Sequence, residues 1–157
     1  MKITTTAFLL FLICSYNTSF AKEVATLKDE CKPNLTGFDV CQKVKEVADN
    51  IAPQLPMKMS SRISIDKIVA LQTKLILTAI LSYDENYLKE QVQKGGITMD
   101  ELLNNLKKAT AKIVCQPKSA TAALVNLGAQ IQYQYYFRDM TPYAVVDIDR
   151  ASCQLKK

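Results

Sequence analysis

Histidine is absent from this sequence of 157 residues, and its cysteines include no C-x-x-C pair. Without an imidazole to act as general base, serine and cysteine triads of the usual kind are excluded. A zinc site is disfavoured for the same two reasons, because its ligands are mainly histidine and paired cysteine. Long apolar runs are also missing after the first twenty residues. The run from Ile68 to Leu81 is interrupted by Gln72 and Lys74, so it predicts buried core and not a membrane span.

The sequence also lacks a cluster of basic residues. It has 20 Lys and Arg against 15 Asp and Glu, a net charge of +5, and the two signs are interspersed. Nucleic-acid binding usually relies on a concentrated basic patch, so that class of function is excluded. A mildly basic surface favours a protein partner of acidic character or an anionic envelope surface.

The first 21 residues have the pattern of a secretory signal. A positive start at Met1-Lys2 precedes the apolar run Ala7–Cys14, and Ser19-Phe20-Ala21 supplies small residues at the two cleavage positions. We expect cleavage after Ala21, which makes residues 22–157 a single exported domain. Bacterial acylation of Cys14 would need a small residue at position 13, where isoleucine stands. We therefore expect a periplasmic or secreted protein, with outer-membrane association only if Cys14 were acylated.

Four cysteines remain beyond the signal: Cys31, Cys41, Cys115 and Cys153. An even number in an exported chain predicts disulfides, and four cysteines allow three pairings. We favour Cys31–Cys41 and Cys115–Cys153. The second bridge would join the end of a long helix to the end of the last strand.

Apolar residues at three- and four-residue steps predict helices. A helix that begins near Thr36 is ended by Pro53 and Pro56. Thr98 and Glu101 form a capping box at the start of the longest helix, which Pro117 stops. The four predicted helices are 36–51, 84–94, 98–115 and 119–128.

Residues 62–83 fit two descriptions. Strands over 62–70 and 74–83 would bury one face, and a single helix would also align several apolar residues. β-branched content and the longer match to period two favour the strands, although no Gly, Asn or Asp marks a turn at 70–74. The buried face of the two strands would consist of Ile63, Ile65, Val69, Leu71, Leu75, Leu77, Ala79, Leu81 and Tyr83.

The C-terminal region predicts a hairpin. Apolar and aromatic residues from Ala129 to Phe137 alternate with glutamines, which indicates a strand with one covered face and one wet face. After a turn at 138–142, the chain returns as a strand over 143–150. The predicted fold class is therefore α+β, with an antiparallel sheet of about four strands in two hairpins packed against helices and stapled by disulfides.

The alternation also selects candidate binding residues. Tyr133 and Tyr135 belong to the covered face and are predicted to be core. The glutamine face would carry Tyr136, and tyrosine offers a large contact area at a low entropy cost. The candidate partner-binding residues are Gln130, Gln132, Gln134 and Tyr136.

Carboxylate pairs are the only constellation that suits catalysis. Asp147 and Asp149 lie two apart on the last strand, hence on one face. A solvated face balanced by Arg138 and Arg150 across the hairpin is the simpler interpretation. We expect no enzyme activity, no cofactor and no metal. Asn34-Leu35-Thr36 matches an N-glycosylation sequon, which would matter only in a eukaryotic secretory pathway.

The order of these elements resembles the β-type pilotins of bacterial type II secretion systems. The resemblance rests on "IVCQPKSATAALVNLGAQIQYQYYFRD" (113–139) and "VVDIDRASC" (145–153), including Cys115, Gly128 and Cys153. It implies a small outer-membrane-associated protein that binds the tail of a secretin. The sequence departs from that pattern in its poor acylation site and in the extra Cys31–Cys41 bridge.

Two functions remain open at this point. The first is a non-catalytic exported adaptor with a pilotin-like fold that binds a secretin or another envelope protein. The alternative is a periplasmic inhibitor or immunity protein that neutralises a toxic enzyme. Both need a protein partner and neither needs nucleic acid or a transmembrane segment.

Overall fold

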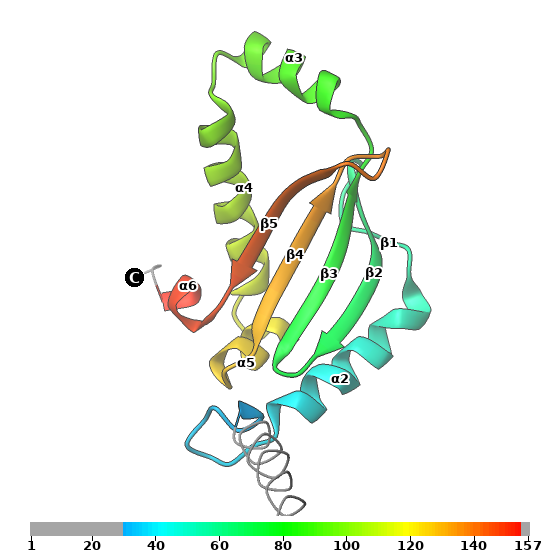
Figure 1. Cartoon of the computed structure of the whole chain (residues 1–157). Helices are drawn as coiled ribbons and strands as arrows, with labels where there is room; N and C mark the ends of the chain where they lie inside the picture. The colour runs from blue at the N-terminus through cyan, green and yellow to red at the C-terminus, as the bar shows by residue number, and fades with distance from the viewer. Residues whose placement is uncertain (1–29, 155–157) are drawn as a thin grey trace, which may run out of the picture.

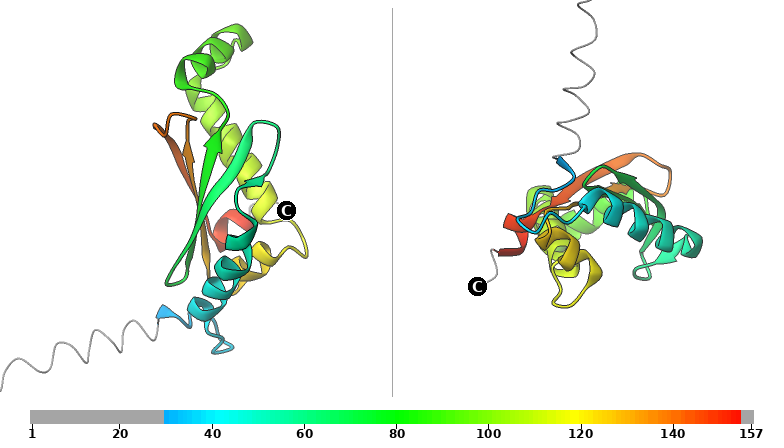
Figure 2. Two further views of the ribbon diagram at one scale, coloured as in Figure 1. Left: turned by 90° about the vertical axis from the view of Figure 1, so that its right-hand side faces the viewer. Right: turned by 90° about the horizontal axis from the view of Figure 1, so that it is seen from below.

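The computed structural model describes residues 30–154, so the predicted signal, its cleavage site and Cys14 lie outside the described part. One sheet lies in front of a layer of helices in the view of Figure 1, and the two layers are seen edge-on in Figure 2. The elements in chain order are α2 (Val40–Ile51), η1 (Ala52–Gln54), β1 (Met57–Lys58), β2 (Ile63–Leu71), β3 (Lys74–Leu81), α3 (Glu85–Gly95), α4 (Met99–Val114), α5 (Ala120–Asn126), β4 (Gln130–Tyr136), β5 (Pro142–Ile148) and α6 (Arg150–Gln154).

The sheet has five strands in the order β1-β2-β3-β4-β5. The α+β class and both predicted hairpins are confirmed, and residues 62–83 form two strands and no helix. Two features differ from the expectation: the short strand β1 adds a fifth strand, and β3 pairs with β4 in parallel. The parallel pair arises because α3, α4 and α5 carry the chain back to the end of the sheet where β3 begins.

The helix ends follow from local capping. Thr98 and Glu101 form the predicted capping box of α4, and Gly96 ends α3 in the left-handed conformation at φ 63°. The helix predicted from Thr36 begins at Val40 instead, because Asp39 accepts a hydrogen bond from the Gln42 amide and acts as the N-cap of α2.

The end of the last strand also differs from the prediction. β5 stops at Ile148, and Asp149 accepts hydrogen bonds from the Ser152 amide (2.8 Å) and hydroxyl (2.7 Å). These bonds start the short helix α6, which the sequence did not reveal. Cys153 therefore lies in a helix and not directly after a strand.

A β-bulge changes the face of β2. The pairing with β3 shifts between Ile65 and Lys67, so Asp66 is the extra residue. Side chains beyond the bulge point to the opposite face from the one that a strict two-residue period predicts. Val69 and Leu71 were predicted to be buried, and this is wrong: they are 38% and 57% exposed, while Ile68 and Ala70 pack against the core.

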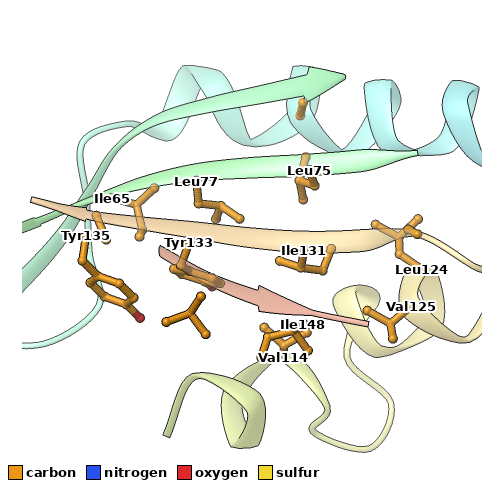
Figure 3. Close-up of a cluster of buried hydrophobic side chains, with 14 of the residues drawn as sticks. Ile65, Leu75, Leu77, Val114, Leu124, Val125, Ile131, Tyr133, Tyr135 and Ile148 are labelled. Atoms are coloured by element: carbon orange, nitrogen blue, oxygen red, sulfur yellow. The ribbon is translucent and has the colours of Figure 1, made fainter. Parts of the chain in front are cut away.

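The core lies between the inner face of the sheet and the helix layer (Figure 3). Alternate residues of β3 and β4 supply its floor, and Tyr133 and Tyr135 are buried as predicted. α2 contributes Val40 and Val44, and α4 contributes Val114. Continuous burial of this kind supplies most of the stability of a small domain.

One buried polar contact ties α4 to the sheet. The Thr110 hydroxyl donates to the Leu106 carbonyl (2.8 Å) and also lies 2.8 Å from the Tyr135 hydroxyl. Because the single proton of Thr110 is used for the carbonyl, Tyr135 is the donor in the second bond.

Both predicted disulfides, Cys31–Cys41 and Cys115–Cys153, are confirmed. The first belongs to a loop that reaches the C-terminal half of the chain. In this loop Asn34 donates to the carbonyls of Phe38 (3.0 Å) and Leu127 (3.2 Å). Its oxygen accepts from the Thr36 hydroxyl, so the sequon residues organise the loop.

Candidate binding surface

The side of the sheet opposite the helices carries no covering element in the part of the chain from 30 to 154. Figure 1 looks onto this side, and the helices lie behind it. Register places outward residues of neighbouring strands in rows, such as Val69, Ile76, Gln132 and Asp147. We call this surface the open face; its residues are Lys67, Val69, Leu71, Lys74, Ile76, Thr78, Ile80, Gln130, Gln132, Gln134, Tyr136, Val145 and Asp147.

Several apolar side chains of the open face are exposed to solvent. Leu71 is 57% exposed, Val145 is 56% exposed and Val69 is 38% exposed. Val69 and Leu71 lie on β2 and Val145 lies on β5, and the half-buried Ile76 and Ile80 lie on β3, one of the two strands between them. Exposed apolar residues on a sheet surface that no other element covers are typical of protein-binding sites.

The structure places all four candidate binding residues on the open face. Gln130, Gln132, Gln134 and Tyr136 are half-buried along β4. Gln134 donates to Gln132 (3.0 Å), and Gln132 donates to Asp147 (2.8 Å). The side-chain amides of Gln132 and Gln134 are therefore ordered before any partner binds.

The candidate carboxylate pair does not form an acid–base site. Asp147 accepts from Gln132 and faces the Lys74 ammonium at 3.9 Å, on the open face. Asp149 lies beyond the strand and caps α6, and its hydrogen bonds from Ser152 lower the pKa of its carboxyl group. The predicted balancing by Arg138 is wrong, because Arg138 pairs with Asp84 at 2.8 Å.

The residues that sequence reasoning missed are Val69 and Leu71 on β2. Their outward direction depends on the bulge at Asp66. The spacing from Ile65 to Ile68 contains the signal, because two charged residues interrupt the alternation there. A two-residue period applied across that interruption assigns the wrong face.

The edge of β2 is also unpaired over much of its length. β1 pairs only with Ser64 and Ile65, so within residues 30–154 no strand borders the outer edge of β2, the edge away from β3, between Asp66 and Leu71. Near this edge, a shallow groove of about 550 Å³ is lined by residues of both α2 and β2. Its lining includes Lys45, Asp49, Ile68 and Ala70. Unpaired backbone groups along a sheet edge can accept an additional strand from a partner.

Metal chemistry finds little support in the described residues. The cluster with suitable ligand atoms consists of Cys31, Asp39 and Cys41. Its two sulfur atoms are bonded to each other, and Asp39 is the N-cap of α2. The carboxylate alone is a weak metal ligand. Among residues 30–154, no helix has both the length and the apolar character needed to cross a bilayer.

Comparison with known proteins gives likeness in structure without likeness in sequence. No family model matches the chain, and no curated protein matches it. A protein from Pseudomonas aeruginosa that is classed as secreted superposes with a TM-score of 0.57 at 16% identity, covering 76% of this chain and 97% of that one.

Two further matches are pilotins of type II secretion systems. EpsS from Vibrio vulnificus has a TM-score of 0.57 at 10% identity, covering 83% of this chain and 97% of its own. AspS from Vibrio cholerae has a TM-score of 0.56 at 13% identity, covering 83% and 98%. The resemblance inferred from the sequence is thus confirmed at the level of structure: the chain has a pilotin-like fold.

Proposed function

We propose that this protein is a non-catalytic adaptor of the cell envelope that binds a partner protein on its open face and along the adjoining edge of β2. The structural likeness to two type II secretion pilotins supports this function, because it extends over almost the whole length of both. A secretin is accordingly the first candidate partner. The two disulfides fit an exported protein.

The observation that carries the proposal is that no element within residues 30–154 covers the open face of the sheet. A sheet covered on one side only normally carries polar side chains on its other side. Here Val69, Leu71 and Val145 break that rule. The apolar margin at Val69 and Leu71 borders the unpaired backbone of β2, so one partner segment can bury both features together.

The chemistry of the site favours binding over catalysis. Each carboxylate that suited acid–base work has a structural task, as a helix cap or as the acceptor of the glutamine ladder. General acid–base catalysis needs a carboxyl whose pKa lies near the working pH, and the pKa of Asp149 is shifted the other way.

The test is a calorimetric titration of the protein, residues 22–157, with the C-terminal segment of the secretin from the same genome. We expect saturable binding that Leu71→Asp and Val145→Asp each weaken at least tenfold, because either change introduces a charge at the contact. Ile113→Asp is the matched control, since Ile113 is 50% exposed on α4 in the helix layer and should leave the affinity unchanged.

Absence of binding to the secretin segment would overturn the secretin assignment. Equal weakening by all three variants would overturn the open face as the site. Protection of cells against a periplasmic toxin, without secretin binding, would instead support the inhibitor or immunity function.

A further inference from the structure

We propose that a second site, at the end of the sheet where β3 leads into α3, binds a carboxylate group between two arginines. The site is a hollow of about 310 Å³. It is lined by Arg62, Ser82, Tyr83, Asp84, Tyr87 and Arg138. This inference does not depend on the secretin proposal, because these side chains lie outside the open face.

Three chain segments far apart in sequence meet at this hollow. They are the start of β2, the β3–α3 junction and the turn after β4, which converge at the top of Figure 1. The Ser82 amide donates to the Arg62 carbonyl (2.9 Å), and the Arg138 amide donates to the Tyr83 carbonyl (3.1 Å). Both arginines are thus attached to the end of β3 through their backbones.

The choice of arginine is itself informative. The sequence has 17 lysines and only three arginines, and two of the three line this one hollow. Lysine supplies charge and solubility elsewhere on the surface. Arginine differs because its planar guanidinium presents paired N–H donors that match the two oxygens of a carboxylate.

Arg62 is positioned without an internal acid. Among residues 30–154, no carboxylate lies within ion-pair distance of its guanidinium. The group instead lies over the Tyr87 ring, 5.9 Å from the centroid. Burial raises the pKa of Tyr83 and the Arg62 charge opposes that shift, which agrees with the guanidinium lying near the phenol. Its donors are therefore available to a ligand.

Arg138 is held on one side and open on the other. One of its N–H groups donates to Asp84 (2.8 Å), whose second oxygen accepts from the Tyr87 amide (2.9 Å). Both carboxylate oxygens of Asp84 are thus engaged, one by Arg138 and the other in capping α3. The neighbouring acids are engaged elsewhere: Glu85 pairs with Lys89 (2.8 Å), and Asp139 accepts from the Thr141 amide (3.0 Å).

The charge of the lining selects the ligand. Two guanidinium groups face one carboxylate, which leaves an excess of one positive charge in the hollow. That excess matches a monoanion such as a carboxylate better than a phosphate dianion. The rings of Tyr83 and Tyr87, with centroids 5.4 Å apart, form an apolar wall beside the donors. A glutamate or aspartate side chain of a polypeptide, or a small free carboxylate, has the required chemistry.

The experiment uses the fact that the chain has only three arginines. Protein labelled with ¹⁵N-arginine gives three side-chain Nε–Hε signals in an NMR spectrum, and Arg150 on α6 is a built-in reference. The probes are sodium acetate, sodium propionate, sodium phosphate, the peptide acetyl-Ala-Glu-Ala-amide and its glutamine analogue. All titrations are made at constant ionic strength.

We expect the Arg62 and Arg138 signals to shift together and saturably with acetate, propionate and the glutamate peptide, while Arg150 stays in place. Arg62→Gln should weaken binding at least tenfold, and Arg150→Gln should have no effect. A response to the free acids but not to the peptide identifies small carboxylates as the ligand, and the reverse identifies a polypeptide. Three signals that move alike, no saturable shift, equal binding of the glutamine peptide, or tighter binding of phosphate would each overturn the carboxylate site.

Discussion

At the scale of single residues, the loop that carries the first disulfide is fitted against the turn before β4. Gly128 has a φ of 102°, and a Cβ atom at this position would lie 2.5 Å from the Pro33 side chain. The Asn34 amide bonds the neighbouring Leu127 carbonyl. Gly128 is therefore required both by its backbone conformation and by the close approach of the loop.

The expected effect of Gly128→Ala follows from those two requirements. The left-handed conformation alone costs a non-glycine residue about 1–2 kcal/mol. Gly37 is the matched control, because it has a φ of 69° and open space where its Cβ would be. Urea unfolding should show that Gly128→Ala lowers the free energy of unfolding by at least about 1 kcal/mol more than Gly37→Ala. The difference is the cost of forcing one methyl group into space that Pro33 already fills. Equal losses would mean that Pro33 moves away freely.

Burial of Tyr133 makes the stability of the folded protein depend on pH in the alkaline range. Its ring stacks on Tyr135 with centroids 5.9 Å apart, and burial raises the pKa of Tyr133 to about 12. The unfolded chain releases this proton near pH 10. The contribution of the neutral Tyr133 phenol to the free energy of unfolding is therefore fully present below pH 10 and is lost as the pH rises towards 12.

We expect the free energy of unfolding to fall by about 2–3 kcal/mol across that interval because of Tyr133 alone. Urea unfolding measured from pH 8 to about pH 12 follows the fall. Tyr133→Phe should reduce the slope without abolishing it, since burial also raises the pKa values of Tyr83, Tyr135 and Tyr143. Parallel curves for wild type and variant would contradict the assignment.

At the scale of elements, α4 and β4 are joined by the hydrogen bond between Thr110 and Tyr135. We expect removal of the Thr110 hydroxyl to cost more stability than removal of the Tyr135 hydroxyl. Tyr135→Phe removes a donor but leaves Thr110 bonded to the Leu106 carbonyl, and should cost about 1 kcal/mol. Thr110→Val leaves the buried Tyr135 hydroxyl without an acceptor, and should cost about 1–3 kcal/mol.

A double-mutant cycle by urea unfolding checks this difference. The double variant should be more stable than Thr110→Val alone, because neither hydroxyl is then left without a partner. A double variant whose loss is the sum of the two single losses would show that the hydroxyls do not interact.

The elements also show what the sequence could reveal. Capping at Thr98 and the alternation after Gly128 predicted α4 and β4 correctly, because both signals are local. The β2–β3 turn gave no such signal, since Gln72 occupies a position with φ 52° that usually belongs to glycine or asparagine. The bulge at Asp66 shifted half of β2 to the other face. The open face could be predicted only in part from the sequence. The glutamines of β4 were predicted to lie on it, but Val69 and Leu71 face outward only because of the bulge.

At the scale of the whole molecule, the two disulfides stabilise different parts. Cys115–Cys153 closes a loop of 38 residues that contains α5 and the last hairpin, and Cys31–Cys41 closes one of 10. Loop entropy alone gives about 4 and about 3 kcal/mol. The shorter bridge also contributes to tertiary structure, because its loop contacts Leu127 and Gly128.

We expect replacement of Cys115 and Cys153 together by alanine to lower the urea midpoint more than replacement of Cys31 and Cys41. The first pair holds the sheet margin at β5 to α4, so its loss also releases the last strand. The intact protein treated with iodoacetamide is the control for accidental reduction. A larger loss for the Cys31 and Cys41 pair would show that the N-terminal loop, and not the last hairpin, limits stability.

The parallel pairing of β3 with β4 has a consequence for the kinetics of folding. Each of the two hairpins, β2–β3 and β4–β5, closes locally and can form within microseconds. The contact that joins them brings Lys74 beside Gln130, across the whole of α3, α4 and α5. Closing so long a loop is entropically costly before the helices have formed. Joining the two hairpins is therefore expected to be the slow step, during which the inner edges of β3 and β4 stay unpaired.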